Sequence, residues 1–346
     1  MQAQKIIQFL LQNRNRKPHF NTASAFAPTN IALIKYWGKR DRELNLPLTN
    51  SLSITLPSLG AHTTLTLNNT ADEIILNGAM LDPNDSFAKR AISFLNLFRI
   101  DSTEHFTLET TVNIPVAAGL ASSAAGFAAL VRALDTLYQW QLSEQELSVL
   151  ARLGSGSACR SFWHGFVEWQ AGNETHGLDS HAYPLDITWP QLRVGIVLLD
   201  STTKKISSRD AMQTTVETSK LFKRWPAQVA QDLATIKMAL KEKNFILLGT
   251  TAENNALSMH ATMEDATPSI SYSSAETLQL RKKIWHCRSQ GLPVFFTQDA
   301  GPNLKLLFLE RDRAAIEELF PDVIIVAPFI DCAPTRGLVP KNADEA

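Results

Sequence analysis

The chain has few of the residues that build disulfide frameworks, metal clusters or membrane spans. Its 346 residues include three cysteines, Cys159, Cys287 and Cys332, with no CxxC pair and no cysteine–histidine spacing typical of zinc sites. No apolar run approaches the roughly 20 residues of a membrane helix. The apolar stretch at the N-terminus is too short and interrupted for a signal peptide. We therefore expect a cytoplasmic protein with reduced thiols, in which all eight histidines are structural or surface residues.

An excess of either charge is also missing. Lys and Arg number 33 and Asp and Glu number 34, which gives a formal net charge of -1. A chain without a basic surplus has no overall electrostatic footprint for nucleic acid, so we expect no nucleic-acid partner and no membrane partner. Any anionic ligand must then meet local cations. The composition, 45% hydrophobic and 19% charged, is that of a folded globular protein.

Strand and helix patterns mix in both halves of the chain, without the regular alternation of a parallel βαβ fold. Strands are predicted at residues 25–36, 51–56, 62–68, 73–76, 106–112, 166–170, 192–199, 293–297 and 322–328. Helices are predicted at 87–98, 123–138, 143–154, 278–290 and 303–319, over most of 214–257, and in an N-terminal helix and polar tether within 1–22. The patterns predict an α+β fold of two domains that meet near residues 185–195.

Two segments rich in glycine, alanine and serine are candidates for binding anions, although the GxxxxGK[ST] and GxGxxG motifs are both absent. PVAAGLASSAA (115–125) precedes the clearest predicted helix, and a helix N-terminus offers free N–H donors to a phosphate chain. GSGSACRS (154–161) ends near Arg160, whose guanidinium suits a carboxylate or phosphate. Tight packing of small residues and a flexible connector are the structural alternatives.

Three further segments carry charged residues in suggestive places. NIALIKYWGKR (30–40) gathers Lys35, Lys39 and Arg40, and an extended chain would put Lys35 and Trp37 on one face. In TQDAGPN (297–303), Asp299 follows an apolar strand and precedes a predicted helix, where it acts as a base or merely as a helix cap. KKISSRDAM (204–212) adds hydroxyls and cations, or is a solvated helix entrance.

Together these segments resemble one family closely. APTNIALIKYWGKRD (27–41), IPVAAGLASSAAG (114–126), ARLGSGSACRSFWHGFVEW (151–169) and DAGPN (299–303) are similar to the diphosphomevalonate decarboxylases of the GHMP kinase superfamily. The likeness runs in order from about residue 25 to about 335 and includes the helical stretch NNALSMHAT (254–262). Four ordered motifs are far more specific than any single one.

The resemblance implies a fold and a reaction. The fold is an N-terminal extension (1–24), a ribosomal protein S5 domain 2-like ATP-binding domain (25–190) and a ferredoxin-like C-terminal domain (191–346), usually as a homodimer. In the reaction, ATP with Mg²⁺ phosphorylates the tertiary 3-hydroxyl of 5-diphosphomevalonate. Loss of phosphate and carbon dioxide then gives isopentenyl diphosphate.

The resemblance also implies site residues. Asp299 matches the catalytic aspartate, Arg160 the arginine that holds the substrate carboxylate, Asn30 a residue that fixes this arginine, and Lys35 a lysine near the transferred phosphoryl group. The implied substrate contacts are Tyr36, Trp37, Gly38, Lys39, Ser155, Gly156, Ser157, Ala158, Cys159, Ser208 and Arg209. The implied ATP contacts are Gly119, Leu120, Ala121, Ser122, Ser123 and Ala124, with Mg²⁺ held through ATP and the hydroxyls of Ser122 and Ser123 as its candidate protein contacts.

Two departures from the family pattern leave alternatives open. Many relatives have an arginine at the position of Ala79, and many have Thr and Gly at the positions of Arg209 and Ala211. We hypothesise that Arg209 replaces the missing cation. The alternatives are a decarboxylase selective for 5-phosphomevalonate, a GHMP kinase that stops at phosphate transfer, and a catalytically dead binding protein, whose lost aspartate or broken phosphate loop is not seen.

Overall fold

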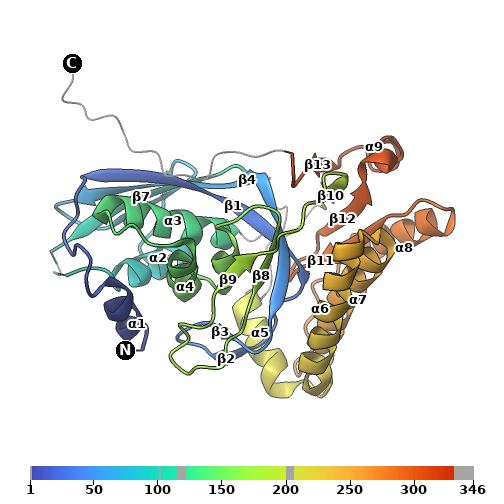
Figure 1. Ribbon diagram of the computed structural model, residues 1–346, viewed down its shortest axis with the longest axis horizontal. Helices are drawn as coiled ribbons and strands as arrows, with labels where there is room; N and C mark the ends of the chain where they lie inside the picture. Colours follow the sequence, from blue (N-terminus) through green and yellow to red (C-terminus); the bar gives the residue numbers. More distant parts are fainter. Residues whose placement is uncertain (1, 101–102, 115–121, 200–205, 331–346) are drawn as a thin grey trace.

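The computed structural model describes residues 2–100, 103–114, 122–199 and 206–330, with only the backbone of Ser122. Two large β-sheets, each with its own helices, confirm the predicted α+β class (Figure 1), and a third sheet has two short strands. The first part of the chain contains α1 (Gln2–Leu11), β1 (Thr22–Ile34), β2 (Lys39–Asp41), β3 (Leu46–Pro47), β4 (Ser51–Asn68), β5 (Glu73–Leu76), β6 (Ala79–Met80), α2 (Ser86–Leu95), β7 (His105–Val112), α3 (Ser122–Tyr138), α4 (Glu144–Gly154), the 3₁₀ helix η1 (Gly156–Arg160), β8 (Phe166–Trp169) and β9 (Ala182–Pro184).

The second part begins at the first strand of the second sheet. It contains β10 (Leu192–Ile196), α5 (Ser208–Thr218), η2 (Leu221–Arg224), α6 (Trp225–Glu242), α7 (Phe245–Glu264), α8 (Ala275–Ser289), β11 (Phe295–Gln298), β12 (Leu304–Leu309), η3 (Glu310–Asp312), α9 (Arg313–Leu319) and β13 (Ile324–Val326). Among the described residues, no helix is both long and apolar enough to cross a membrane.

The long strand β4 organises the first sheet, whose order is β6-β5-β7-β4-β8-β9 with β1 also paired to β4. The sequence predicted two strands here, but 51–56 and 62–68 form one strand. Gly60 lets β4 stay paired with β1 at this point, because a Cβ atom here would lie 2.2 Å from the carbonyl oxygen of Ala27. The strand bends at a register shift beside Gly60 instead of turning back.

The second sheet is antiparallel, in the order β11-β12-β10-β13. The sequence predicted a helix over 303–319, and this prediction is wrong for its first half, where Leu304–Leu309 forms β12. The segment is a nearly continuous apolar run whose residues are mostly buried, and such a run fits a buried strand as well as a helix. Pairing with β10 and β11 decides the outcome.

Two hydrophobic cores hold these layers together. One joins α1, α2, α3 and α4 to the outer half of the first sheet. The other joins the inner ends of β1 and β4 to β10, α6, α7 and β11. This shared core brings the end of β1 next to the end of β11, and the polar residues that follow these two strands form the candidate site.

Local signals in the sequence place several helix ends correctly. Ser143 caps α4, and its hydroxyl and the carboxylate of Glu146 form a capping box at the start of the predicted helix. The N-terminal helix is also confirmed, as α1 buries Ile6, Ile7 and Leu11 against the first core. Gly154 is the last residue of α4, as predicted.

Candidate active site

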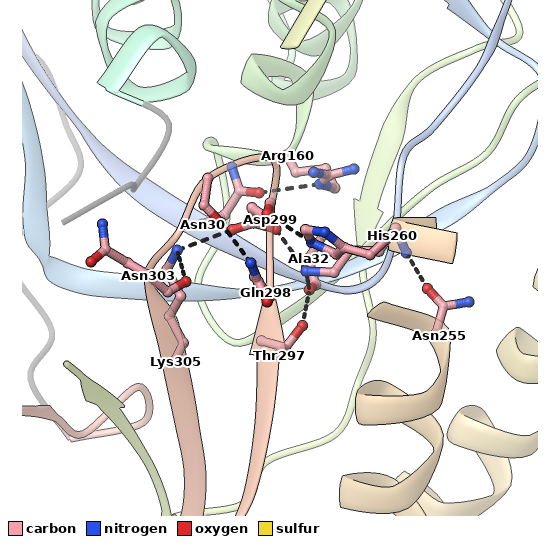
Figure 2. Close-up of polar contacts among 12 residues, drawn as sticks. Asn30, Ala32, Arg160, Asn255, His260, Thr297, Gln298, Asp299, Asn303 and Lys305 are labelled. Atoms are coloured by element: carbon pink, nitrogen blue, oxygen red, sulfur yellow. Dashed lines mark hydrogen bonds and ion pairs between the residues drawn. The ribbon is translucent and has the colours of Figure 1, made fainter. Parts of the chain in front are cut away.

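The centre of the site is an ion pair between residues that follow two different strands. Lys35 comes directly after β1, and its Nζ lies 2.7 Å from Oδ1 of Asp299, which comes directly after β11. The side chain of Lys35 is 2% exposed, whereas that of Asp299 is 30% exposed. Lys35 Nζ also donates to the carbonyl oxygen of Ala32. The lysine is thus held inside the protein, whereas the carboxylate of Asp299, near the centre of Figure 2, is partly exposed.

A second buried lysine faces the same carboxylate. Lys305 belongs to β12 and is 1% exposed, and its Nζ lies 3.6 Å from Oδ2 of Asp299. Burial alone would raise the pKa of Asp299, but the charges of Lys35 and Lys305 outweigh burial and hold this pKa well below its usual range. Asp299 is therefore ionised at neutral pH and is a weak proton acceptor.

Arg160 and Asn30 form the second pair of the site. Arg160 is the last residue of η1, and its Nε donates to Oδ1 of Asn30 over 3.2 Å. Another guanidinium nitrogen donates to the hydroxyl of Ser51, and the guanidinium lies over the ring of Trp169. Asn30 is itself fixed, because its Nδ2 donates to the hydroxyl of Ser161 over 2.8 Å. These contacts hold the buried guanidinium in one orientation.

The segment after Lys35 does not continue the strand, since β1 ends at Ile34, two residues before the predicted end at 36. Trp37 packs into the shared core. Its carbonyl oxygen accepts a hydrogen bond from Nε1 of Trp225 over 2.9 Å. Gly38 has φ +106, and a Cβ atom there would lie 2.7 Å from the ring of Phe222. Glycine is required at this turn.

The predicted substrate contacts divide into open and buried side chains. Trp37, Ala158 and Cys159 have buried side chains, so only their backbone groups are placed to meet a ligand. Burial raises the pKa of Cys159 to about 12, which leaves an inert thiol. Tyr36 is half-buried against Trp169, with ring centroids 4.7 Å apart. Gly156 is buried, and Ser155 and Ser157 are half-buried.

The charge of Arg209 acts on both Lys39 and Arg90, and we call these three cations the cationic cluster. Lys39 is half-buried, and its Nζ donates to Oδ1 of Asn45 over 2.6 Å. Burial and the charges of Arg209 and Arg42 lower the pKa of Lys39 to about 8. Arg209 is exposed in the first turn of α5, beside Ser208, and its charge also acts on Arg90 of α2. Ala79 is exposed in β6.

The predicted ATP contacts lie only partly within the described residues. Gly119, Leu120 and Ala121 fall outside them, and Ser122 begins α3. Ser123 is half-buried and Ala124 is buried. The first turn of α3 contains no acidic residue, so no carboxylate of that turn offsets the positive end of the helix.

Sequence reasoning missed several residues that touch the predicted ones, among them Ser51, Asn255, His260 and Lys305. Asn255 accepts a hydrogen bond from the backbone N–H of Lys35, and His260 lies 3.2 Å from the carbonyl oxygen of Asp299. His260 was predicted to be structural. The sequence does contain a signal for Lys305, which is a charged residue inside an apolar run. Asn255 and His260 lie in the family-like stretch NNALSMHAT (254–262). No sequence pattern indicated Arg90.

Comparison with known proteins identifies related sequences over both halves of the chain. Residues 27–182 match a family described as diphosphomevalonate decarboxylase-like N-terminal domain. Residues 194–334 match a mevalonate 5-diphosphate decarboxylase C-terminal domain. The diphosphomevalonate decarboxylase of Aspergillus fumigatus is 40% identical over 319 residues, which are 85% of this chain and 78% of the relative. That of Saccharomyces cerevisiae is 38% identical over 320 residues, or 85% and 80% of the two chains.

Solved structures give the same result for the fold. A complex of MDDEF with MVAPP, AMPPCP and magnesium superposes with a TM-score of 0.84 at 39% identity, over 89% of this chain and 97% of the other. The mevalonate diphosphate decarboxylase from Staphylococcus aureus also gives 0.84, at 34% identity over 92% and 97% of the chains.

Proposed function

The chain belongs to the diphosphomevalonate decarboxylase family, and we propose that its Lys35–Asp299 and Asn30–Arg160 pairs carry the reaction. The protein has the two-domain GHMP kinase fold and is an ATP-dependent decarboxylase of the mevalonate pathway. It converts 5-diphosphomevalonate to isopentenyl diphosphate, ADP, phosphate and carbon dioxide, with ATP and Mg²⁺ as cofactors.

The observation that carries the proposal is the ion pair of Lys35 and Asp299. A tertiary hydroxyl is a poor leaving group, and its phosphorylation makes it a good one. When phosphate leaves C3, positive character develops there, and an ionised carboxylate stabilises it best from a fixed position. Asp299 is ionised, partly exposed and held by Lys35. We infer that Asp299 acts mainly by its charge and by orienting the hydroxyl, because its lowered pKa makes it a weak base.

Arg160 is proposed to hold the substrate carboxylate through the guanidinium donors that Asn30 and Ser51 leave free. A fixed arginine binds a carboxylate with two parallel hydrogen bonds. It keeps the carboxylate at C1 in line as the C1–C2 bond breaks. The electron pair of that bond then forms the C2–C3 double bond, and carbon dioxide and phosphate depart. Asn30 positions Arg160 by accepting from its Nε.

The start of α3 fits Mg·ATP, which supplies the phosphoryl group when bound. A 17-residue helix without an acid in its first turn presents free N–H groups to phosphates. We propose that Ser122, Ser123 and Ala124 hold ATP together with Gly119–Ala121, and that a serine hydroxyl reaches the metal. Lys35 is proposed to offset negative charge on the transferred phosphoryl group.

The cationic cluster is proposed to bind the diphosphate of the substrate. Lys39 and Arg209 come from different elements, and the charge of Arg209 acts on Lys39. Converging positive charges repel one another until an anion joins them. Arg209 thereby compensates for the neutral Ala79. The remaining contacts proposed for the diphosphate are Tyr36, Ser155, Gly156, Ser157 and Ser208, and the backbone of Trp37, Gly38, Ala158 and Cys159.

Assembly and location are proposed on the same family likeness. We expect a cytoplasmic homodimer with domains at 25–190 and 191–346 and an extension at 1–24. The buried thiols of Cys159 and Cys287 are unpaired, as a reducing compartment favours. Light scattering of the purified protein tests the dimer, and a monomer at micromolar concentration would contradict it.

Release of ADP and carbon dioxide tests the function. Purified protein is given Mg·ATP with either mevalonate 5-diphosphate or mevalonate 5-phosphate. We expect equal amounts of ADP and carbon dioxide from the diphosphate alone. Activity with the monophosphate alone would overturn the substrate assignment, and ADP without carbon dioxide would overturn the roles of Arg160 and Asp299.

A further inference from the structure

Helix α7 contacts both segments that supply the central ion pair. It packs closely on β11, because Gly249 faces the ring of Phe295 and a Cβ atom there would lie 2.2 Å from that ring. Glu253 of the same helix accepts a hydrogen bond from the backbone N–H of Phe296. Figure 1 shows α7 beside α6, at the end of the molecule that contains β11. The strand that leads to Asp299 therefore rests on α7.

The first contact from α7 to the site is made by Asn255. Its Oδ1 accepts from the backbone N–H of Lys35 over 2.8 Å, and its Nδ2 donates to Oδ2 of Asp232 over 2.7 Å. Asp232 of α6 also accepts from Gln228 over 2.8 Å. Because an ionised carboxylate only accepts, Asp232 determines which way the amide of Asn255 points. The buried amide thus presents a fixed acceptor to Lys35.

The second contact from α7 is made by His260, which is 2% exposed. Its Nε2 lies 3.2 Å from the carbonyl oxygen of Asp299, and a carbonyl only accepts, so Nε2 carries the proton. Nδ1 has no hydrogen-bond partner among the residues that the structure describes. Burial, with the charges of Arg281 and Lys35, lowers the pKa of His260 to about 3 despite the opposing charge of Asp299. The ring is therefore a neutral, fixed donor.

We propose that Asn255 and His260 are positioning residues through which one helix sets the separation of Lys35 and Asp299. Both hydrogen bonds end on backbone atoms, so neither one occupies the Nζ of Lys35 or the carboxylate of Asp299. Figure 2 shows His260 and Lys305 on opposite sides of Asp299. The inference rests on the proposed function, in which Lys35 and Asp299 act on the substrate together. A misplacement of about 1 Å in a reacting group lowers the rate about 100-fold, so their separation matters.

Two amide variants of His260 test the donor. The Nε2 of Gln reaches the place of the imidazole Nε2, whereas the shorter Asn does not. We expect His260→Gln to retain at least about a third of kcat and His260→Asn to lose about 20-fold or more, with KM for both substrates within about threefold. Equal kcat values in the two variants, or losses confined to KM, would overturn the role of His260.

Asn255→Ala and Asn254→Ala form the matched pair for the other contact, because Asn254 is exposed on the same helix. We expect Asn255→Ala to lower kcat about 20-fold or more with KM nearly unchanged, and Asn254→Ala to leave kcat unchanged. Similar kcat values in both variants would overturn the role of Asn255. Melting temperatures of all four variants separate a lost position from a lost fold.

A readout without turnover keeps this inference separate from the proposed function. Long-range ¹H–¹⁵N spectra of the wild-type protein should contain one imidazole that stays neutral and protonated at Nε2 from pH 8 to pH 5. This signal should be missing in His260→Gln. An imidazole at position 260 that is protonated at Nδ1 or charged at pH 6 would overturn the donor assignment. Wild-type protein that releases no carbon dioxide would instead overturn the proposed function.

Discussion

The ion-paired centre, which consists of Lys35, Asp299 and Lys305, balances opposite charges, whereas the cationic cluster brings like charges together. At the centre, Asp299 lies between Lys35 and Lys305, and each oxygen of the carboxylate faces a buried ammonium group. In the cluster, the like charge of Arg209 acts on both Lys39 and Arg90. The pKa values show the difference, because that of Asp299 is held well below its usual range and that of Lys39 is lowered to about 8.

The difference teaches which part of the site is complete before substrate binds. The centre is satisfied by contacts within the protein, so its geometry is preorganised for the developing charge at C3. The cluster is stabilised only when an anion joins its cations, so it suits the part of the substrate that stays unchanged. We therefore expect changes at the centre to lower kcat and changes in the cluster to raise KM.

Asp299→Asn gives the largest expected effect. The amide keeps the shape of the carboxylate but removes its charge, so we expect kcat to fall about 1,000-fold or more. KM for the diphosphate substrate should change by less than about threefold. Steady-state measurement of carbon dioxide release at varied diphosphate concentration, with saturating Mg·ATP, gives both values. A variant that keeps a tenth of wild-type kcat would show that the centre does not act by charge.

Lys35→Met should follow, with kcat about 100-fold lower. Methionine matches the length of the lysine stem and fills the buried space, so the fold is retained while the charge beside Oδ1 is lost. Lys305 still faces the other oxygen, which makes the loss smaller than for Asp299→Asn. Steady-state ADP and carbon dioxide assays measure the change. A raised KM with normal kcat would place Lys35 functionally with the cluster.

Arg209→Ala tests the cluster itself. Loss of one phosphate-binding cation should raise KM for the diphosphate substrate at least about tenfold, or about 1.4 kcal/mol, with kcat unchanged. Arg224→Ala, at an exposed arginine on η2, is the control. An unchanged KM would contradict the hypothesis that Arg209 replaces the cation missing at Ala79.

The smallest expected effect is a pH dependence of Lys39. Its pKa is lowered to about 8, so its positive charge is present below that pH and lost above it. We expect kcat/KM for the diphosphate substrate to fall about tenfold between pH 7 and pH 9. Lys39→Arg should remove this fall, because guanidinium stays charged. A fall that persists in Lys39→Arg would assign the titration to another group.

Local sequence signals predicted much of the fold. The capping box at Ser143 and Glu146 gave the start of α4, and apolar periodicity gave α3, β5 and β7 close to their observed bounds. These signals act over a few residues, so neighbouring side chains suffice to determine the bounds of these elements. The predicted helix at 303–319 failed at β12, where pairing with distant strands overrides local preference.

The site shows the same division. The sequence by itself identified the residues that resemble family motifs, among them Lys35, Arg160 and Asp299, because each lies in a short and specific stretch. Only the tertiary structure decided that Lys305 faces the carboxylate of Asp299 and that α7 contacts both members of the ion pair. Those contacts join segments far apart in the chain. They exist because one hydrophobic core packs β1, α7 and β11 together, and no local pattern specifies that packing.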